Sequence, residues 1–284
     1  MSIDDAPRLR MPDLRFVPVE SLIPHEQHDE SRSGPLVQRM REQGVLRNPP
    51  IVAELSPGEA RYVILDGANR ATAARAAGLP HLLVQVVRYE DTGVRLTTWH
   101  HGLVGLPVAE IEAMLRSIAG LETCVCDMRH AHAVLARREA IAFIATDPDR
   151  AITLHGGGDL AHRNAVLNAV VDGYRSRIRF YRVTSEVIQE ARTEHPEITA
   201  LVVFPHFEPA EVLELATSGA RLPAGITRHV VSWRALRINV PLDLLSDTRR
   251  SLEEKNRWLD EWVREKTLQR QVRFYQEPTV LFDE

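Results

Sequence analysis

A carboxylate and a guanidinium stand four residues apart in the segment Asp66-Gly67-Ala68-Asn69-Arg70. A carboxylate is a ligand that Mg²⁺ prefers, and a guanidinium matches the geometry of a phosphate group. Two such groups so close in the chain indicate phosphoryl chemistry. An ordinary turn with a surface aspartate and a surface arginine explains the same five residues, and the segment alone does not separate the two interpretations.

The residues around this segment predict a strand, a tight turn and a helix. Tyr62–Leu65 is a short apolar run with β-branched residues, which favours a buried strand. Gly67 permits backbone conformations that other residues resist, and the alanine-rich run Ala71–Ala77 favours a helix that Gly78 ends. Because the first turn of a helix has unpaired N–H groups and a partial positive charge, the start of this helix can bind phosphate.

The composition indicates a globular protein with one large domain or two ordinary ones. The 284 residues are 44% apolar, and 35 basic residues stand against 39 acidic ones, which gives a net charge of −4. Proteins that coat nucleic acid usually carry a basic surplus, so this balance argues against that role. Two cysteines make no disulfide framework. No apolar run approaches the roughly 20 residues of a membrane span, and the N-terminal residues lack a signal-peptide core. We therefore expect a soluble cytoplasmic protein.

Strands and helices alternate along the chain, which predicts an α/β fold. Strands are expected at Leu14–Pro18, Pro80–Val87, Glu139–Ala145, Ala151–Leu154, Ile178–Thr184 and Thr199–Phe204. Helices are expected from Ser33 or Gly34 to Gly44 and at Pro107–Ala119, Leu160–Gly173, Ser185–Thr193, Pro209–Thr217 and Leu252–Val272.

Two further groups of residues have the types that bind metals or phosphates. Cys124 and Cys126 precede His130 and His132, but this order lacks the usual C-x₂-C spacing, so we expect no metal site there. Three glycines in the range 155–159 precede an expected helix and could cradle a phosphate, yet they lack the lysine of a phosphate-binding loop. A simple flexible turn explains them at least as well.

Four stretches of the chain, in order, resemble segments of one known family. They are Pro24-His25-Glu26-Gln27, Asp66-Gly67-Ala68-Asn69-Arg70, Thr98-Trp99 and Pro223-Ala224-Gly225-Ile226-Thr227-Arg228-His229. They look like the catalytic-glutamate segment, the D-G-x-H-R phosphate turn, the T-W segment and the late T-R-H segment of the free L-serine kinases, which belong to the ParB/sulfiredoxin-like superfamily. The resemblance spans nearly the whole chain. It implies a ParB/sulfiredoxin-like nucleotide-binding domain over residues 1–105 and a second α/β domain over residues 106–284, packed over the first to complete the serine site.

The resemblance implies a reaction in which ATP or ADP, with Mg²⁺, phosphorylates the hydroxyl of free L-serine, and O-phospho-L-serine then feeds siderophore or cysteine synthesis. Glu26 would accept the proton of the hydroxyl, and Asp66 would act in catalysis and hold Mg²⁺. Residues at the start of the helix would bind the nucleotide phosphates, namely Gly67, Ala68, Asn69, Arg70 and Thr72. A second group would bind serine, namely Trp99, Thr227, Arg228 and His229.

Departures from the pattern separate this chain from other members of the superfamily. Ala68 stands where sulfiredoxins carry their catalytic cysteine, so their redox chemistry is absent. Asn69 replaces the usual histidine of the serine kinases, and an amide can donate to a phosphate but cannot take up a proton. A ParB-like DNA-binding or regulatory role is the alternative, although the chain shows neither a helix-turn-helix pattern nor an arginine-rich second motif. The sequence indicates no oligomeric state.

Overall fold

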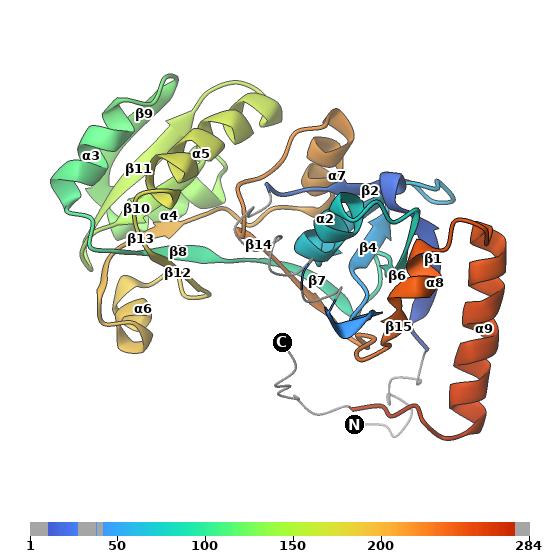
Figure 1. Cartoon of the computed structure of the whole chain (residues 1–284). Helices are drawn as coiled ribbons and strands as arrows, with labels where there is room; N and C mark the ends of the chain where they lie inside the picture. Colours follow the sequence, from blue (N-terminus) through green and yellow to red (C-terminus); the bar gives the residue numbers. More distant parts are fainter. Residues whose placement is uncertain (1–10, 28–37, 39–41, 276–284) are drawn as a thin grey trace, which may run out of the picture. The chain divides into compact units, whose positions relative to one another are not determined.

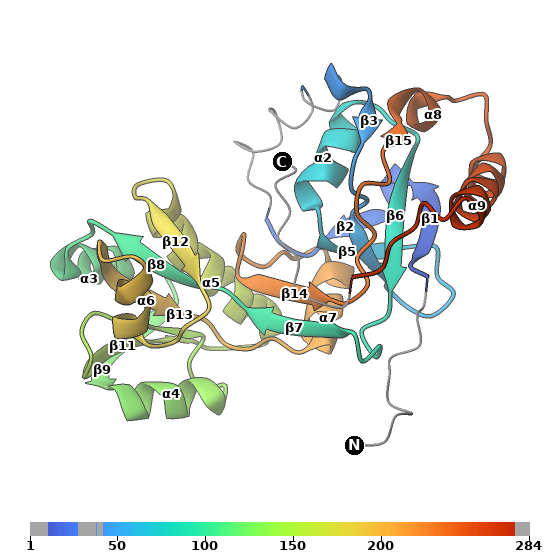
Figure 2. The same cartoon turned by 90° about the horizontal axis from the view of Figure 1, so that it is seen from below.

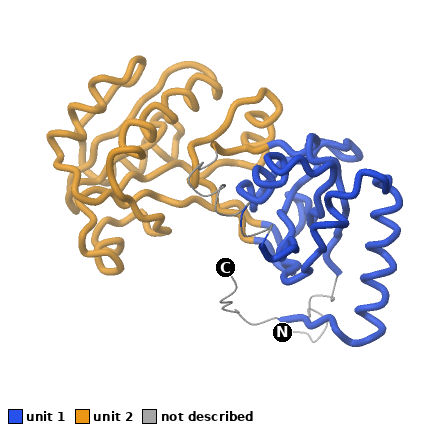
Figure 3. Tube along the Cα trace, viewed as in Figure 1, with its two compact units in different colours: residues 1–23, 29–94, 231–284 blue, residues 24–28, 95–230 orange. Residues whose placement is uncertain are grey.

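The structure is a computed structural model that describes residues 11–27, 38 and 42–275. It divides into two compact units (Figure 3). Unit 1 comprises residues 1–23, 29–94 and 231–284, and unit 2 comprises residues 24–28 and 95–230. Each unit is therefore assembled from separate segments, unlike the continuous ranges expected from the sequence. The two domains expected at residues 1–105 and 106–284 stay a prediction.

Unit 1 is built on a five-stranded sheet in the order β1-β6-β4-β5-β2 (Figure 1). Its strands are β1 (Asp13–Pro18), β2 (Leu22–Pro24), β4 (Ile51–Glu54), β5 (Tyr62–Asp66) and β6 (His81–Val87). Strand β4 runs antiparallel to β5 and parallel to β6, and β1 runs antiparallel to β6. Helix α2 (Ala68–Ala76) follows β5 directly, so the predicted strand, turn and helix are confirmed.

The C-terminal segment completes unit 1. Strand β15 (Val240–Pro241) pairs with β3 (Val45–Leu46), and the short helix α8 (Leu242–Ser246) leads to the long helix α9 (Leu252–Leu268). Helix α9 packs against β1, where the Asn256 amide bonds to both the N–H and the C=O of Phe16. Trp258 of α9 meets the Phe16 ring edge-on. The expected charged helix is confirmed and ends at Leu268, before the expected Val272.

Unit 2 is built on a six-stranded antiparallel sheet in the order β12-β8-β13-β10-β11-β9 (Figure 2). Its strands are β8 (His100–Val104), β9 (Leu121–Asp127), β10 (Ala142–Ala145), β11 (Arg150–Gly156), β12 (Phe180–Val183) and β13 (Ile198–Val203). Strands β7 (Val94–Thr98) and β14 (Thr227–Val231) form a separate two-stranded ribbon. The helices are α3 (Val108–Arg116), α4 (Met128–Ala136), α5 (Leu160–Arg175), α6 (Ile188–Glu194) and α7 (Pro209–Ser218).

Most expected elements are confirmed with shifted ends, and local contacts explain the shifts. Strand β10 begins at Ala142 rather than Glu139, because Arg138 takes a left-handed conformation (φ 60°) in the turn after α4. Helix α6 begins at Ile188 rather than Ser185, because the Ser185 hydroxyl accepts from the backbone N–H of Val187 before the helix starts. The helix expected from Ser33 falls largely outside the described residues. No helix in the described ranges has the length and apolar character needed to cross a membrane.

Candidate active site

The predicted phosphate turn, Asp66–Arg70, lies in unit 1 between β5 and α2. Gly67 occupies the N-cap position of α2 with a left-handed backbone (φ 87°), and no side chain caps the start of this helix. A Cβ at this position would lie 2.8 Å from the Arg70 guanidinium and 3.0 Å from the Cα of Pro50, so a glycine is required. The first-turn N–H groups of a helix have no partner within the helix. Here the uncapped first turn comprises Ala68, Asn69 and Arg70.

Two arginines bind the carboxylate of Asp66. Its Oδ2 accepts from Arg70 Nη2 at 3.3 Å and also from Arg234 Nη2. Burial would raise the pKa of Asp66, but the charges of Arg234 and Arg70 outweigh burial and hold that pKa below its usual value. Asp66 is therefore ionised at neutral pH, as a metal ligand must be. Thr72, the remaining predicted phosphate ligand, lies half-buried one turn further along α2.

Glu26 lies in unit 2, and its carboxylate is fixed by the loop that precedes β14. Oε2 accepts from the N–H of Gly225 at 2.8 Å, and Oε1 accepts from the N–H groups of Ile226 at 3.2 Å and Thr227 at 2.7 Å. The Thr227 hydroxyl donates to the same Oε1 at 2.5 Å. Both carboxylate oxygens are thus held in position by short, charge-assisted hydrogen bonds.

The Thr227 hydroxyl also bonds to the His25 ring. Its oxygen lies 2.8 Å from His25 Nε2. Because the hydroxyl gives its one proton to Glu26, its oxygen must accept from His25, so Nε2 of His25 carries a hydrogen. The His229 ring meets the His25 ring edge-on, with centroids 5.2 Å apart. All three side chains belong to buried residues, which makes this a pre-organised polar cluster.

Trp99 is tied to the same loop. The backbone N–H of Trp99 donates to the carbonyl of Ile226 at 2.9 Å, and the Arg228 guanidinium lies 4.8 Å from the centroid of the Trp99 ring. Such a cation–π contact orients both groups. The structure therefore brings together all of the predicted serine-binding residues of unit 2 and the predicted proton acceptor Glu26.

A buried histidine and a buried tyrosine hold the loop that precedes β14 in position. His101 and Tyr174 are both 0% exposed, with His101 Nδ1 2.6 Å from the Tyr174 hydroxyl and His101 Nε2 3.3 Å from the carbonyl of Gly225. The carbonyl can only accept, so Nε2 donates to it and Nδ1 accepts from the tyrosine. Burial lowers the pKa of His101 to about 3, so the ring is neutral. Gly225 itself has a left-handed backbone (φ 76°), and a Cβ there would overlap the Arg182 guanidinium.

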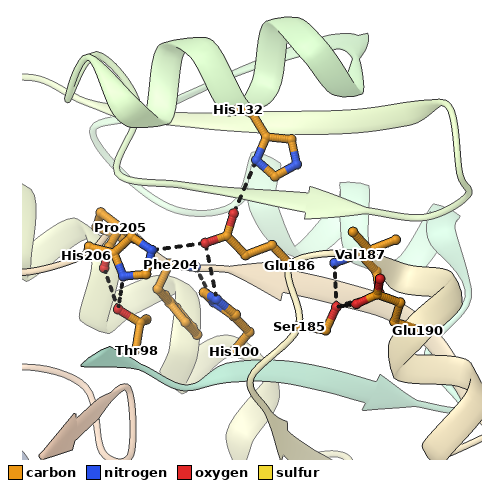
Figure 4. Close-up of polar contacts among 10 residues, drawn as sticks. All are labelled: Thr98, His100, His132, Ser185, Glu186, Val187, Glu190, Phe204, Pro205 and His206. Carbon is orange, nitrogen blue, oxygen red and sulfur yellow. Dashed lines mark hydrogen bonds and ion pairs between the residues drawn. The ribbon is translucent and has the colours of Figure 1, made fainter. Parts of the chain in front are cut away.

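The residues on either side of Trp99 connect to a second polar cluster, centred on Glu186 (Figure 4). Its carboxylate lies 3.1 Å from His206 Nε2, 3.3 Å from His132 Nδ1 and 3.7 Å from His100 Nε2. His206 Nδ1 in turn lies 3.0 Å from the Thr98 hydroxyl. Burial, and then the neighbouring His206 and His132, lower the pKa of His100 to about 3. This cluster fixes the backbone on both sides of Trp99.

Metal-ligating side chain types do not converge on a metal site within the described part of the chain. Within it, no group of three or more histidine, cysteine, aspartate or glutamate side chains could hold a metal ion. Cys124 is exposed and Cys126 is half-buried, and neither forms a disulfide. The expectation that these residues hold no metal stays a prediction.

Sequence reasoning missed several residues that the structure places at these two groups. In unit 1 it missed Arg234, and in unit 2 it missed the supporting pair His101 and Tyr174. His25 lay inside a quoted segment, but no role was assigned to it. None of these residues stands in a sequence pattern that indicates its partner, so only the fold reveals these contacts.

The chain is similar in sequence to curated L-serine kinases. It is 22% identical to an ATP-dependent L-serine kinase of Desulfurococcus mucosus over 81% of this chain and 90% of that protein. It is 26% identical to the ATP-dependent L-serine kinase SbnI of Staphylococcus aureus over 82% of this chain and 84% of that protein. It is 24% identical to the ADP-dependent L-serine kinase SerK of Thermococcus kodakarensis over 86% of this chain and the whole of that protein. No protein-family model matches the chain.

The fold is also that of solved serine kinases. A free serine kinase in complex with AMP superposes with a TM-score of 0.70 at 22% identity, over 86% of this chain and 98% of that one. A C-terminally truncated SbnI from Staphylococcus aureus gives a TM-score of 0.69 at 21% identity, over 90% and 96% of the two chains. By sequence over more than four-fifths of its length and by fold, the chain is therefore related to the free L-serine kinases.

Proposed function

We propose that this protein transfers a phosphoryl group from a nucleotide to the hydroxyl of free L-serine and forms O-phospho-L-serine. The observation that supports this most is the cluster around Glu26, where Trp99, Thr227 and Arg228 meet in a chain similar to L-serine kinases along most of its length. The kinase relatives match over more than four-fifths of the chain, and the DNA-binding alternative is set aside on that ground.

Unit 1 supplies the nucleotide-binding residues in this proposal. Arg70, Asn69 and Thr72, with the N–H groups at the start of α2 and the backbone of Gly67 and Ala68, bind the phosphates of the donor. Asp66 fits a Mg²⁺ ion because Mg²⁺ is usually held by one or two carboxylates together with substrate phosphates, and Asp66 is ionised and 41% exposed. When bound, Mg²⁺ neutralises charge on the phosphates.

Unit 2 supplies the serine-binding residues. Glu26 accepts the proton of the serine hydroxyl as the new O–P bond forms and the bond from phosphorus to the bridging oxygen of the nucleotide breaks. A carboxylate is a weak base for an alcohol, so the proton moves late in the step. Arg228 and His229 bind the serine carboxylate or the transferring phosphate, Thr227 orients Glu26, and Trp99 forms a wall of the serine site.

The direct test is to incubate the purified protein with L-serine and Mg²⁺, with ATP in one arm and ADP in the other, and to detect O-phosphoserine by ³¹P NMR. Curated relatives use one or the other donor, so both are needed. We expect product with at least one nucleotide. Lack of product with both would refute the proposal.

Replacing the proton acceptor tests its role. Glu26→Gln keeps the shape and loses the base, so we expect kcat to fall by about 10²–10⁴-fold while the Kd for nucleotide changes little. Glu214→Gln alters an exposed carboxylate on α7 and is the matched control. Unchanged turnover in Glu26→Gln would assign the base to another residue.

A further inference from the structure

Arg234 binds the carboxylate of Asp66 although the two residues lie far apart in the sequence. Residue 234 lies 168 positions beyond Asp66, yet its guanidinium binds the same carboxylate oxygen as Arg70. Two positive groups thus face one negative group at the start of α2. The N-terminus of a helix adds about half a positive charge, so this corner carries an excess of positive charge that suits an anion.

A buried glutamine fixes the backbone on both sides of Arg234. Gln85 in β6 is 3% exposed, and its Nε2 donates to the carbonyl of Trp233 at 3.0 Å while its Oε1 accepts from the N–H of Ala235 at 2.8 Å. A primary amide is costly to bury unless both of its ends are bonded. Here both ends are used on the two peptide groups that flank Arg234, which sets the direction of the arginine.

The segment 232–239 is also held in unfavourable backbone conformations. Trp233, Arg237 and Asn239 have φ values of 59°, 55° and 54°, although none is a glycine. Residues persist in this left-handed region only where their surroundings hold them, and such residues gather at ligand clamps. The holding contacts are hydrogen bonds from Ser232 N–H to the Gly93 carbonyl and from Arg237 N–H to the Asn48 side chain, each 2.8 Å long.

We propose that Arg234 is a second phosphate-binding guanidinium of the nucleotide site and that Gln85 is its positioning residue. The inference rests on the proposed nucleotide site at Asp66–Arg70 and adds to it a residue from a distant part of the chain. Asp66 keeps the guanidinium beside the start of α2, and a donor phosphate bound there takes hydrogen bonds from Arg234 together with those from Arg70. A fork of N–H donors matches phosphate oxygens in pairs, as a lysine cannot.

The test measures nucleotide binding without serine and separates it from catalysis. The Kd values of ADP and ATP are determined by isothermal titration calorimetry, with and without Mg²⁺, for the wild type, Arg234→Ala, Arg234→Lys and Gln85→Met. Arg249→Ala, which removes an exposed arginine of unit 1 that is paired with Asp247, is the control. We expect Arg234→Ala to weaken binding about 10- to 100-fold, as the loss of a charge-assisted hydrogen bond predicts. The loss should be present without Mg²⁺, since it does not depend on the metal.

Arg234→Lys and Gln85→Met test the role of Arg234 even if Arg234→Ala does not fold. Arg234→Lys keeps the charge beside Asp66 and loses the fork, so we expect a weakening of about 3- to 10-fold. Gln85→Met keeps the arginine but frees its backbone, so it should weaken nucleotide binding by no more than Arg234→Ala does. In the double variant Gln85→Met/Arg234→Ala, the Kd should equal that of Arg234→Ala alone, because Gln85 acts only through Arg234. Wild-type Kd values in both Arg234→Lys and Gln85→Met would overturn the inference. A wild-type protein that binds nucleotide without forming O-phosphoserine would refute the kinase proposal and not this one.

Discussion

The two neighbouring histidines at the start of β8 make unit 2 sensitive to acid. His100 is 1% exposed and His101 is 0% exposed, and burial lowers the pKa of each to about 3. In the unfolded chain a histidine has a pKa of about 6.5. The folded state therefore binds fewer protons, and its stability is complete above pH 6.5 and falls as the pH drops from about 6.5 towards 3.

The loss of unfolding free energy at low pH follows from the difference in histidine pKa between the folded and unfolded states. Each histidine contributes a slope of about 1.4 kcal/mol per pH unit below its unfolded pKa, which amounts to about 2 kcal/mol at pH 5. The pair together should cost about 4 kcal/mol at pH 5, a large part of the 5–15 kcal/mol that stabilises a typical domain. The free energy of unfolding is to be measured by urea denaturation with far-ultraviolet circular dichroism at pH 7, 6 and 5.

A variant isolates the contribution of one ring. His101→Phe suits a site lined by Tyr174, Phe180 and Phe204, and it should halve the pH slope attributed to the pair. It also removes the hydrogen bonds to Tyr174 and Gly225, so we expect a loss of about 1–3 kcal/mol at neutral pH. His130→Gln, at an exposed position, is the control and should keep the wild-type slope. A stability that is flat from pH 7 to 5, or a His101→Phe variant with an undiminished slope, would refute the reasoning.

Two further substitutions test the geometry of the proposed site. An alanine in the left-handed region costs roughly 1–2 kcal/mol. Gly67→Ala should lower the free energy of unfolding by more than this, because its Cβ would also lie 3.0 Å from the Pro50 backbone. A thermal melt identical to that of the wild type would contradict this. Thr227→Val removes the hydroxyl between Glu26 and His25 and should lower kcat/KM by about 10- to 100-fold. Thr227→Ser keeps a hydroxyl and should retain most of the wild-type kcat/KM. Equal activity in the two variants would count against a role for the hydroxyl.

Local patterns in the sequence were sufficient to predict the strand, turn and helix around Asp66–Arg70. The strand predicted at Tyr62–Leu65 is β5, and a helix follows Gly67 as expected. The helix starts at Ala68 rather than Ala71, because the left-handed Gly67 lets it begin at once. That shift matters, since it puts Asn69 and Arg70 in the first turn, where backbone N–H groups and side chains act together.

Contacts between distant segments could not be predicted in the same way. Gln85 lies in an apolar run that correctly predicts a strand, but nothing in that run indicates that its amide bonds to residues 233 and 235. Arg234 lies in a stretch without regular periodicity, and its role depends on a backbone path set by three left-handed residues. The resemblance assigned Glu26 and Thr227 to one site, and the structure places their side chains in contact, whereas composition or spacing alone would not have paired them. Their roles in catalysis and serine binding stay predictions.

The discontinuous build of unit 1 has a consequence for how the chain acquires its structure during synthesis. The residues of unit 2 up to position 230 leave the ribosome before β15 and α9 exist, although these two elements pair with β3 and cover β1. Four side chains from this late segment belong to the buried core of unit 1, namely Val240, Leu244, Leu245 and Leu259. Domains generally fold as units as they emerge. Unit 2 can therefore fold on the nascent chain first, while the sheet of unit 1 must wait, with apolar surface exposed, for the last segment to be made.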